Sequence, residues 1–476
     1  LQRPRFLAIR EFGPGALIYH EGARYQVTRI QLPPDTTGDL VTGEAQRCPA
    51  CGYHHEPADR DDRCRMCDTP LGVPTTGLLQ LHTVYTTLRE RISSDEEERR
   101  RAGFKLVTSY RFQDHGARPG RVDALVSDAE GRIATVSYGD SARVRVTNLR
   151  RLRAKPDEPD GYWLDPADGR WLNERDAAEA SGDSSEMPVA DADGNEKRRK
   201  IRVIPYVQDT RNILVLKLEQ RLEVPMALSL MYALERGIEA AFELEDSELT
   251  SELLPSDDQP TDRILFTEAA EGGAGVLRLM QSQPGALARA AAEALAICHF
   301  DEEGNDLGGP HPDRPCARGC YECLLTYGNQ IHHWAIDRHA VRDLLLRFAR
   351  ARAVPTGPGE SRTEQLARLT AQADTALEAR LITWLKERGL RLPDEAQTLI
   401  PEAHARPDFV YRLPGVNVAV FVDGPVHDAA DVAQRDREAE ERLLDLGWDV
   451  VRFPHDGDWA AIAREFERYF GPGVNT

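Results

Sequence analysis

The sequence lacks any run of about 20 apolar residues, the length that a membrane-spanning helix requires. Its first residues also lack the apolar core of a secretory signal. We therefore expect a cytoplasmic protein with no membrane partner. The chain begins with Leu1 rather than Met, which suggests a piece of a longer polypeptide.

Cysteine is scarce, with 8 among 476 residues. This is too few for a disulfide scaffold in a chain of this length. Since no secretion signal is present, the grouping of the cysteines into two clusters favours metal binding instead.

Acidic residues outnumber basic ones. The chain has 79 Asp and Glu and 60 Lys and Arg, which gives a net charge of −19. A chain with this charge does not coat nucleic acid through its global electrostatics. Any nucleic-acid binding must therefore use a local basic patch.

What remains is an ordinary globular composition, 41% hydrophobic and 29% charged, which excludes a disordered or fibrous chain. At about 150 residues per domain the length suggests roughly three domains. We predict a mixed α/β, multidomain fold. Its parts are a β-rich region with the first cysteine cluster at 1–90, a mixed β region with a flexible acidic loop at 91–205, an α/β region with the second cluster at 206–353, and an α/β region at 362–476.

Local patterns place several elements. Strands are expected at Ala16–Tyr19, Tyr25–Thr28 and Val416–Val422, and helices at Ser94–Gly103, Met226–Ala241, Ala286–Cys298, Asp337–Arg352 and Ala430–Leu446. The Pro- and Gly-rich segment Val354–Ser361 indicates a linker, and residues 175–198 a flexible loop.

The first cluster reads CxxC, twelve residues, CxxC, and comprises Cys48, Cys51, Cys64 and Cys67. Two CxxC turns joined by a short hairpin can close a tetrahedral site of four thiolates, which leaves no open coordination position. We expect structural zinc here. The alternative is a pair of reduced dithiols. His54 and His55, inside the loop, are expected to face solvent.

The second cluster comprises Cys316, Cys320 and Cys323, with Cys298 seventeen residues upstream as the fourth ligand. We predict a second structural zinc held by four thiolates. An iron–sulfur cluster and a three-cysteine site completed by His311 or His299 remain as alternatives, because soft thiolates suit both metals.

The run from Cys316 through Tyr321, Tyr327 and Asn329 to Arg338 resembles the zinc-binding domain of MrfA-type DNA repair helicases. The upstream segment Thr267–Gly275 is similar to that family's Gly-rich element. The resemblance is specific from about 200 to 350. It implies DNA as a partner, together with the motor domains of a DEAD/DEAH-box superfamily 2 helicase, in the same polypeptide or a separate subunit. Bacterial anti-phage systems such as DISARM and Druantia carry proteins with this domain, so other defence proteins are further implied partners.

The chain departs from those helicases in one respect. It contains neither a GxxxxGK[ST] phosphate loop nor a DExH box, so we expect no ATP hydrolysis by this chain alone. Gly272-Gly-Ala-Gly275 lacks the following Lys and is expected to serve close backbone packing or a helix N-terminus.

The segment 362–476 resembles the restriction-endonuclease-like fold, especially Vsr-type nuclease domains. That resemblance implies a magnesium-dependent nuclease site formed by Glu378, Asp408, Asp423 and His427. The usual E-x-K is absent, because the corresponding positions read Phe421-Val422-Asp423. A degenerate domain kept for DNA docking or packing is the alternative.

Two basic clusters are candidates for phosphate contacts. The first cluster comprises Arg143, Arg145, Arg150, Arg151, Arg153 and Lys155. The second comprises Lys197, Arg198, Arg199, Lys200 and Arg202. Each cluster is explained equally well as solvent-exposed positive charge that balances nearby acidic residues. Aromatic residues do not alternate with these cations along the sequence, so a platform for stacking unpaired bases is not indicated.

Three functions compete: a non-catalytic, zinc-stabilised accessory module of a superfamily 2 DNA helicase in phage defence or DNA repair, a metal-dependent DNA nuclease, and an assembly adaptor that contacts only protein. We favour the first. Two bound zinc ions are expected in each case, with magnesium added if the nuclease-like domain is active.

Overall fold

The computed structural model describes the chain except for residues 33–39, 58–61, 92–102, 114–119, 153, 156–157, 174–176, 178–199, 246, 257, 270–272, 310, 312, 359–361, 414–415, 425–438 and 472–476. It divides into two compact units. One contains residues 1–60 and 72–359, and the other contains 360–476 together with 61–71. The helix predicted at Ser94–Gly103 and most of the predicted loop 175–198 lie outside the described residues. Among the described helices, none combines the length and apolarity needed to cross a bilayer.

Within the described residues the strands of the first unit form two sheets. A three-stranded sheet contains β1 (Leu17–His20), β2 (Ala23–Ile30) and β6 (Val84–Arg91). An eleven-stranded sheet contains β3 (Gly43–Arg47), β4 (His54–His55), β5 (Thr75–Gln80), β7 (Phe104–Arg111), β8 (Val122–Asp128), β9 (Gly131–Arg151), β10 (Tyr162–Leu164), β11 (Ile201–Leu222), β12 (Leu249–Leu254), β13 (Thr261–Glu268) and β14 (Arg352–Pro358).

The large sheet is organised around its two longest strands, β9 and β11, which pair antiparallel. Their register shifts between Arg211 and Ile213, opposite the segment that holds Ser141 at a left-handed φ of 55°. A bulge of this kind bends a long strand and strengthens its twist. Strands from all three regions that the sequence analysis separated at 90 and 205 therefore pair in one sheet.

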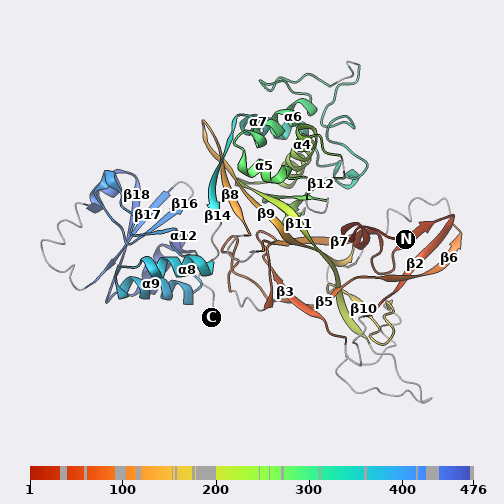
Figure 1. Ribbon diagram of the computed structural model, residues 1–476, viewed down its shortest axis with the longest axis horizontal. Helices are drawn as coiled ribbons and strands as arrows, with labels where there is room; N and C mark the ends of the chain where they lie inside the picture. Colours follow the sequence, from red (N-terminus) through yellow and green to blue (C-terminus); the bar gives the residue numbers. More distant parts are fainter. Residues whose placement is uncertain are drawn as a thin grey trace, which may run out of the picture. The chain divides into compact units, whose positions relative to one another are not determined.

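The helices of this unit are α1 (Arg5–Glu11), α4 (Val224–Phe242), α5 (Val276–Ser282), α6 (Ala286–Ile297), α7 (Arg338–Arg350) and the 3₁₀ turn η2 (Gln330–His332). Helices α4 to α7 gather together beside the sheet (Figure 1). In α4 the apolar residues recur at helical spacing, as at Leu230, Leu234 and Ile238, and these are fully buried. The core joins these helices to β8, β9, β11 and β13.

The prediction of a linker at Val354–Ser361 is wrong for the first part of that segment, because Val354–Pro358 belong to β14, which pairs with β8. The proline and glycine that suggested a linker are compatible with this strand. β14 is the end strand of the sheet, where a missing backbone N–H is tolerated, and its register shifts between Pro355 and Gly357.

The second unit has a four-stranded sheet in the order β15 (Glu395–Ala396), β16 (Phe409–Leu413), β17 (Val416–Asp423) and β18 (Trp448–Pro454). Its helices include α8 (Arg362–Gln372), α9 (Ala376–Glu387), the 3₁₀ turn η3 (Pro401–Ala403), α11 (Trp459–Glu465) and α12 (Glu467–Phe470), and residues 439–445 are also helical. β16 and β17 pair antiparallel, and β17 and β18 pair parallel. The apolar faces of α8 and α9 pack against these strands in a separate core.

Candidate metal centre

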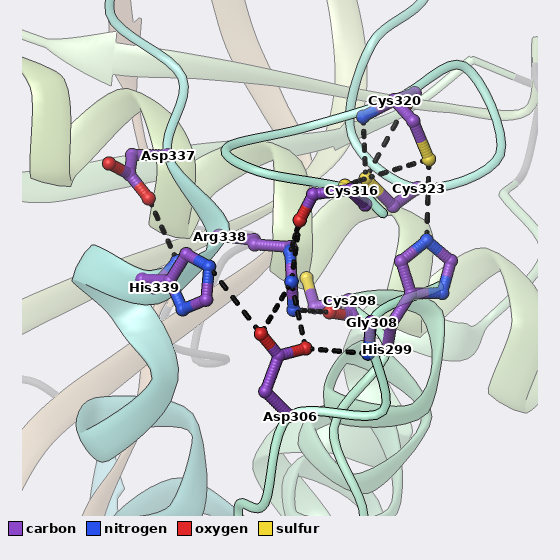
Figure 2. Close-up of polar contacts among 10 residues, drawn as sticks. All are labelled: Cys298, His299, Asp306, Gly308, Cys316, Cys320, Cys323, Asp337, Arg338 and His339. Carbon is purple, nitrogen blue, oxygen red and sulfur yellow. Dashed lines mark hydrogen bonds and ion pairs between the residues drawn. The ribbon is translucent and has the colours of Figure 1, made fainter. Parts of the chain in front are cut away.

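Three cysteines of the second cluster converge in the loop that joins α6 to α7 (Figure 2). The Cys316 and Cys323 sulfurs are 3.7 Å apart, and the Cys320 and Cys323 sulfurs are 3.5 Å apart. Four thiolates around zinc at about 2.3 Å would be separated by about 3.8 Å. The sulfurs therefore already have the spacing of ligands on one ion.

The fourth position has two neighbouring candidates. His299 belongs to the group with the three cysteines, all of whose ligand atoms lie within 4.8 Å of one another. Its Nε2 lies 3.3 Å from the Cys320 sulfur, whereas the sulfur of the neighbouring Cys298 is not among the ligand atoms of this group. Cys298 ends α6 and is fully buried. The structure thus brings His299 into the group, and the sequence prediction of Cys298 stays a prediction.

The chemistry of this donor set fits a soft divalent cation. Burial, and next the neighbouring Cys323 sulfur, raise the pKa of Cys316 to about 12. Burial likewise raises the pKa of Cys298. Buried thiols that crowd one another ionise when a metal supplies the compensating charge. Together with the domain match reported below, this set supports zinc.

A buried arginine fixes the two ends of this loop. Arg338, at the start of α7, is 1% exposed and donates to the carbonyl oxygen of Cys316 and to that of Cys298, the latter at 3.0 Å. Its charge is paired with Asp306 at 2.8 Å. Figure 2 shows the guanidinium between these partners. Sequence reasoning had used Arg338 only as part of a motif and missed this structural role.

The first cluster is also assembled, because the ligand atoms of Cys48, Cys51, Cys64 and Cys67 lie within 4.8 Å of one another. The turn after Cys48 is closed by the Gly52 N–H, which donates to the Cys48 carbonyl oxygen at 3.0 Å. Gly52 adopts a φ of 73°, which favours glycine. These four cysteines form the metal group that the spacing predicts.

The expectation that His54 and His55 face solvent is wrong. They are 1% and 0% exposed, because β4 pairs with β3 and His55 packs edge-on against the Tyr53 ring. Burial lowers the pKa of His54 to about 4, and a contact with Glu56 opposes that shift. His54 is therefore a neutral packed side chain at physiological pH.

The Gly-rich segment before α5 serves packing, as the sequence predicts. A Cβ at Gly273 would lie 2.0 Å from a carboxylate oxygen of Glu268 and 2.1 Å from Asn212. Glu268 is fully buried and accepts a hydrogen bond from the Leu277 N–H in the first turn of α5. The buried Glu268 carboxylate thus packs directly against this segment and the first turn of α5. Gly272 lies outside the described residues.

The basic clusters separate into different environments. Arg143 and Arg145 turn toward Glu56, with N–O distances of 2.8 and 3.4 Å, and Arg145 is buried. Arg150 and Arg151, by contrast, line a surface cavity. Lys200 lies over the Trp163 ring at 5.2 Å. Arg153 and Lys197, Arg198 and Arg199 lie outside the described residues.

In the second unit, two of the nuclease candidates share a neighbour. Gln397 donates to Glu378 at 2.8 Å and to Asp408 at 3.4 Å. Burial raises the pKa of Asp408 to about 6. A hydrogen bond from the Val422 N–H opposes this rise, and the charge of Glu378 reinforces it. Asp423 contributes to that rise and pairs with Arg452 at 2.8 Å. His427 lies outside the described residues.

The contacts of Glu378 also have a purely structural explanation. Glu378 and Thr375 cap the start of α9. The Glu378 N–H donates to the threonine hydroxyl at 3.2 Å, and that hydroxyl donates to the glutamate at 2.7 Å. The Asp374 N–H donates to the other carboxylate oxygen at 2.8 Å. Among the described residues, these carboxylates do not form a metal-binding group of the kind seen for the cysteines.

Comparisons with known proteins find one family, described as the MrfA Zn-binding domain, which matches residues 230–324. The matched range contains Cys298, Cys316, Cys320 and Cys323. No curated protein sequence matches the chain. A solved structure, titled "Crystal Structure of DUF1998 helicase MrfA bound to DNA", is similar with 11% identity and a TM-score of 0.31. The similarity covers 72% of this chain and 31% of that protein, so the chain spans about a third of its length.

Proposed function

We propose that this chain is a zinc-stabilised accessory module of an ATP-driven superfamily 2 DNA helicase, and that it contacts DNA for motor domains in the same polypeptide or in a separate subunit. The match of residues 230–324 to the MrfA Zn-binding domain carries the proposal. It is supported by a second, independent cysteine group and by the lack of a phosphate loop and a DExH box in the sequence.

The zinc sites have a structural role in this proposal. Zinc held by thiolates contributes folding free energy outright. Here the second group joins the end of α6 to the loop that leads to α7, and these helices belong to the core that packs on the large sheet. We propose that zinc fixes this surface for DNA, and that the module serves in phage defence or DNA repair.

The test is DNA binding by the purified chain, followed by fluorescence anisotropy over a series of salt concentrations. We expect binding that weakens steeply with salt, no ATP hydrolysis by the chain alone, and stimulation of DNA-dependent ATP hydrolysis when a superfamily 2 motor is supplied. Tight binding to the motor without any DNA binding would instead select an assembly adaptor.

A metal-dependent nuclease is the second candidate, and the shared contact of Glu378 and Asp408 with Gln397 favours it. The carboxylates of Glu378 and Asp423 both repel that of Asp408, which a bound Mg²⁺ would relieve. The test is Mg²⁺-dependent cleavage of plasmid DNA. Cleavage abolished by Asp408→Ala and retained in Asp445→Asn, an exposed aspartate of the same unit, would support the nuclease. Absence of cleavage by the unaltered chain would leave the accessory module alone.

A further inference from the structure

The first unit contains an open cavity of about 930 Å³ between the small sheet and one end of the large sheet. Its walls come from β2, β6, the end of β9, β10 and the start of β11, together with residues 154, 155, 158, 161 and 170–173. No single stretch of sequence contributes more than a small part of this surface. The volume is at the upper end of the range for small-ligand sites, roughly 300–1,000 Å³.

The cavity is cationic in a chain of net charge −19. Four of its side chains, Arg29, Arg89, Arg151 and Lys155, have no carboxylate within 4.0 Å in the part of the chain that the structure describes. Arg89 donates instead to the side-chain oxygen of Gln26 at 2.7 Å, and Arg151 to a backbone carbonyl at 3.0 Å. These partners are neutral, so among the described residues no carboxylate within 4.0 Å compensates the charge of either guanidinium group.

Three further arginines line the same cavity, and each has a described carboxylate nearby. Arg150, Arg170 and Arg202 lie 3.7, 3.3 and 3.9 Å from carboxylate oxygens. Glu158 is the one acid among the described lining residues. The cavity therefore carries a clear excess of positive charge, which attracts phosphate.

Arg150 and Arg202 also hold the wall near Lys155, Glu158 and Asp160. Arg150 donates to the carbonyl oxygens of Lys155 and Glu158 at 3.2 and 3.4 Å, and Arg202 to that of Asp160 at 2.9 Å. This part of the cavity is thus held before any ligand arrives, which lowers the entropic cost of binding.

Aromatic rings stand among the cations. Tyr85 is 42% exposed, and the Arg29 guanidinium lies over its ring at 4.7 Å. The Arg202 guanidinium lies over the Trp163 ring at 5.2 Å. Trp171 carries a buried indole N–H that has no acceptor among the described residues. Rings that already stack with guanidinium groups are the kind of surface on which unpaired bases stack.

We propose that this cavity binds an unpaired DNA strand, with phosphates on the arginines and bases against Tyr85 and the tryptophans. The inference rests on the proposed function and adds the place and form of the DNA. A duplex presents only base edges in its grooves, whereas the flat faces that aromatic side chains stack on are exposed in a single strand. The volume accommodates a few nucleotides of one strand.

The experiment measures anisotropy of fluorescein-labelled oligo(dT) and of a blunt duplex of equal length with the full chain. Arg29→Glu combined with Arg89→Glu should weaken oligo(dT) binding at least tenfold and lower the slope of log affinity against log salt by about 1.4, the value for two lost phosphate contacts on a single strand. Arg221→Glu combined with Arg352→Glu is the matched control, because both are exposed strand arginines outside the cavity. Thermal melting of every variant confirms folding.

Base stacking is tested separately. Tyr85→Ala should weaken oligo(dT) binding about fivefold or more, and Tyr85→Phe should bind like the unaltered chain, since the ring is retained. Duplex binding should be weaker than oligo(dT) binding.

The outcomes separate this inference from the proposed function. If the chain binds DNA but the cavity variants behave like the control pair, the inference is overturned and the proposed function stands. If duplex binds as well as oligo(dT) and Tyr85→Ala has no effect, the assignment of an unpaired strand is overturned. If the unaltered chain binds no DNA, both fail.

Discussion

Arg338 donates two hydrogen bonds to the carbonyl oxygen of Cys316, one of them from Nε at 2.9 Å. The same guanidinium reaches Cys298 and Asp306, so one side chain joins the loop of the cysteines to the end of α6. Only a planar fork with several fixed donors can meet acceptors in these different directions at once.

Arg338→Lys should therefore destabilise the protein and loosen the second zinc. A lysine keeps the charge but cannot reach all the acceptors, which leaves buried groups without partners at a cost of roughly 3 kcal/mol. The measurements are urea denaturation and the rate of zinc loss to a chromophoric chelator. Arg342→Lys is the control, because Arg342 lies on the same helix, is exposed and pairs with Asp343. Equal behaviour of the two variants would contradict the role of Arg338.

The fourth zinc ligand gives a second prediction. The distances favour His299, but turning a side chain between rotamers costs on the order of 1 kcal/mol, whereas structural zinc contributes about 10 kcal/mol or more. Zinc binding can therefore draw the buried Cys298 sulfur into the group. We expect the unaltered protein to hold two zinc ions, Cys298→Ser to hold one, and His299→Ala to hold two. Metal analysis and the thiolate-to-metal absorption of the cobalt-substituted protein report the ligand set. The reverse pattern would make His299 the ligand.

The cysteine groups were predictable because short spacings within tight turns bring the sulfurs together with little help from the rest of the chain. The family match agrees for residues 230–324. The environment of His54 was not predictable, since its burial depends on the pairing of β4 with β3 and on residues of β7. The same holds for Pro355, whose place in a strand depends on β14 lying at the sheet edge.

The cationic cavity illustrates the limit of local patterns more strongly. Along the sequence the aromatic residues do not alternate with the basic clusters, and a stacking surface was not indicated. In the structure Arg29 meets Tyr85 across β2 and β6, and Arg202 meets Trp163 across β10 and β11. The alternation of cation and ring is created by strand pairing, which one sequence does not reveal.

Asp408 makes folding depend on pH. Its pKa is about 6 in the folded protein against 3.8 ordinarily. Between these pH values the folded state binds more protons than the unfolded state. The contribution of Asp408 to the free energy of unfolding is therefore greatest below pH 4, and it is lost as pH rises through 6. Asp408→Asn cannot ionise, and its amide oxygen can still accept from the Val422 N–H.

We therefore expect Asp408→Asn to gain stability over the unaltered chain as pH rises from 4 to 7, by about 2 to 3 kcal/mol at most. Urea denaturation at a series of pH values measures this gain. Asp445→Asn, at an exposed position of the same unit, should show no such trend. A loss of stability in Asp408→Asn above pH 6 would mean that the carboxylate is compensated, as it would be by a bound cation.

The last prediction concerns the contact between α4 and α6, the helix that ends at Cys298. A Cβ at Gly237 would lie 2.2 Å from the carbonyl oxygen of Ala290 and 2.8 Å from the Cβ of Ala294. The first of these neighbours is backbone, so the two helices would have to separate. Alanine gains about 1 kcal/mol over glycine in helix propensity. Overpacking at a contact this tight costs typically 1–3 kcal/mol and occasionally more.

Gly237→Ala should therefore lower the free energy of unfolding by about 1 kcal/mol or more and speed zinc loss to a chelator, because α6 carries one end of the metal loop. Gly285→Ala is the matched control. Gly285 precedes α6, has nothing within 4 Å of the position of a Cβ, and has a φ of −101° that alanine adopts readily. Because Gly285 is the N-cap of α6, where glycine is preferred to alanine, this variant should lose roughly 0.5–1 kcal/mol from capping alone and leave the rate of zinc loss unchanged. A Gly237→Ala variant more stable than the unaltered chain would show that propensity outweighs packing, and that α4 does not set the position of α6.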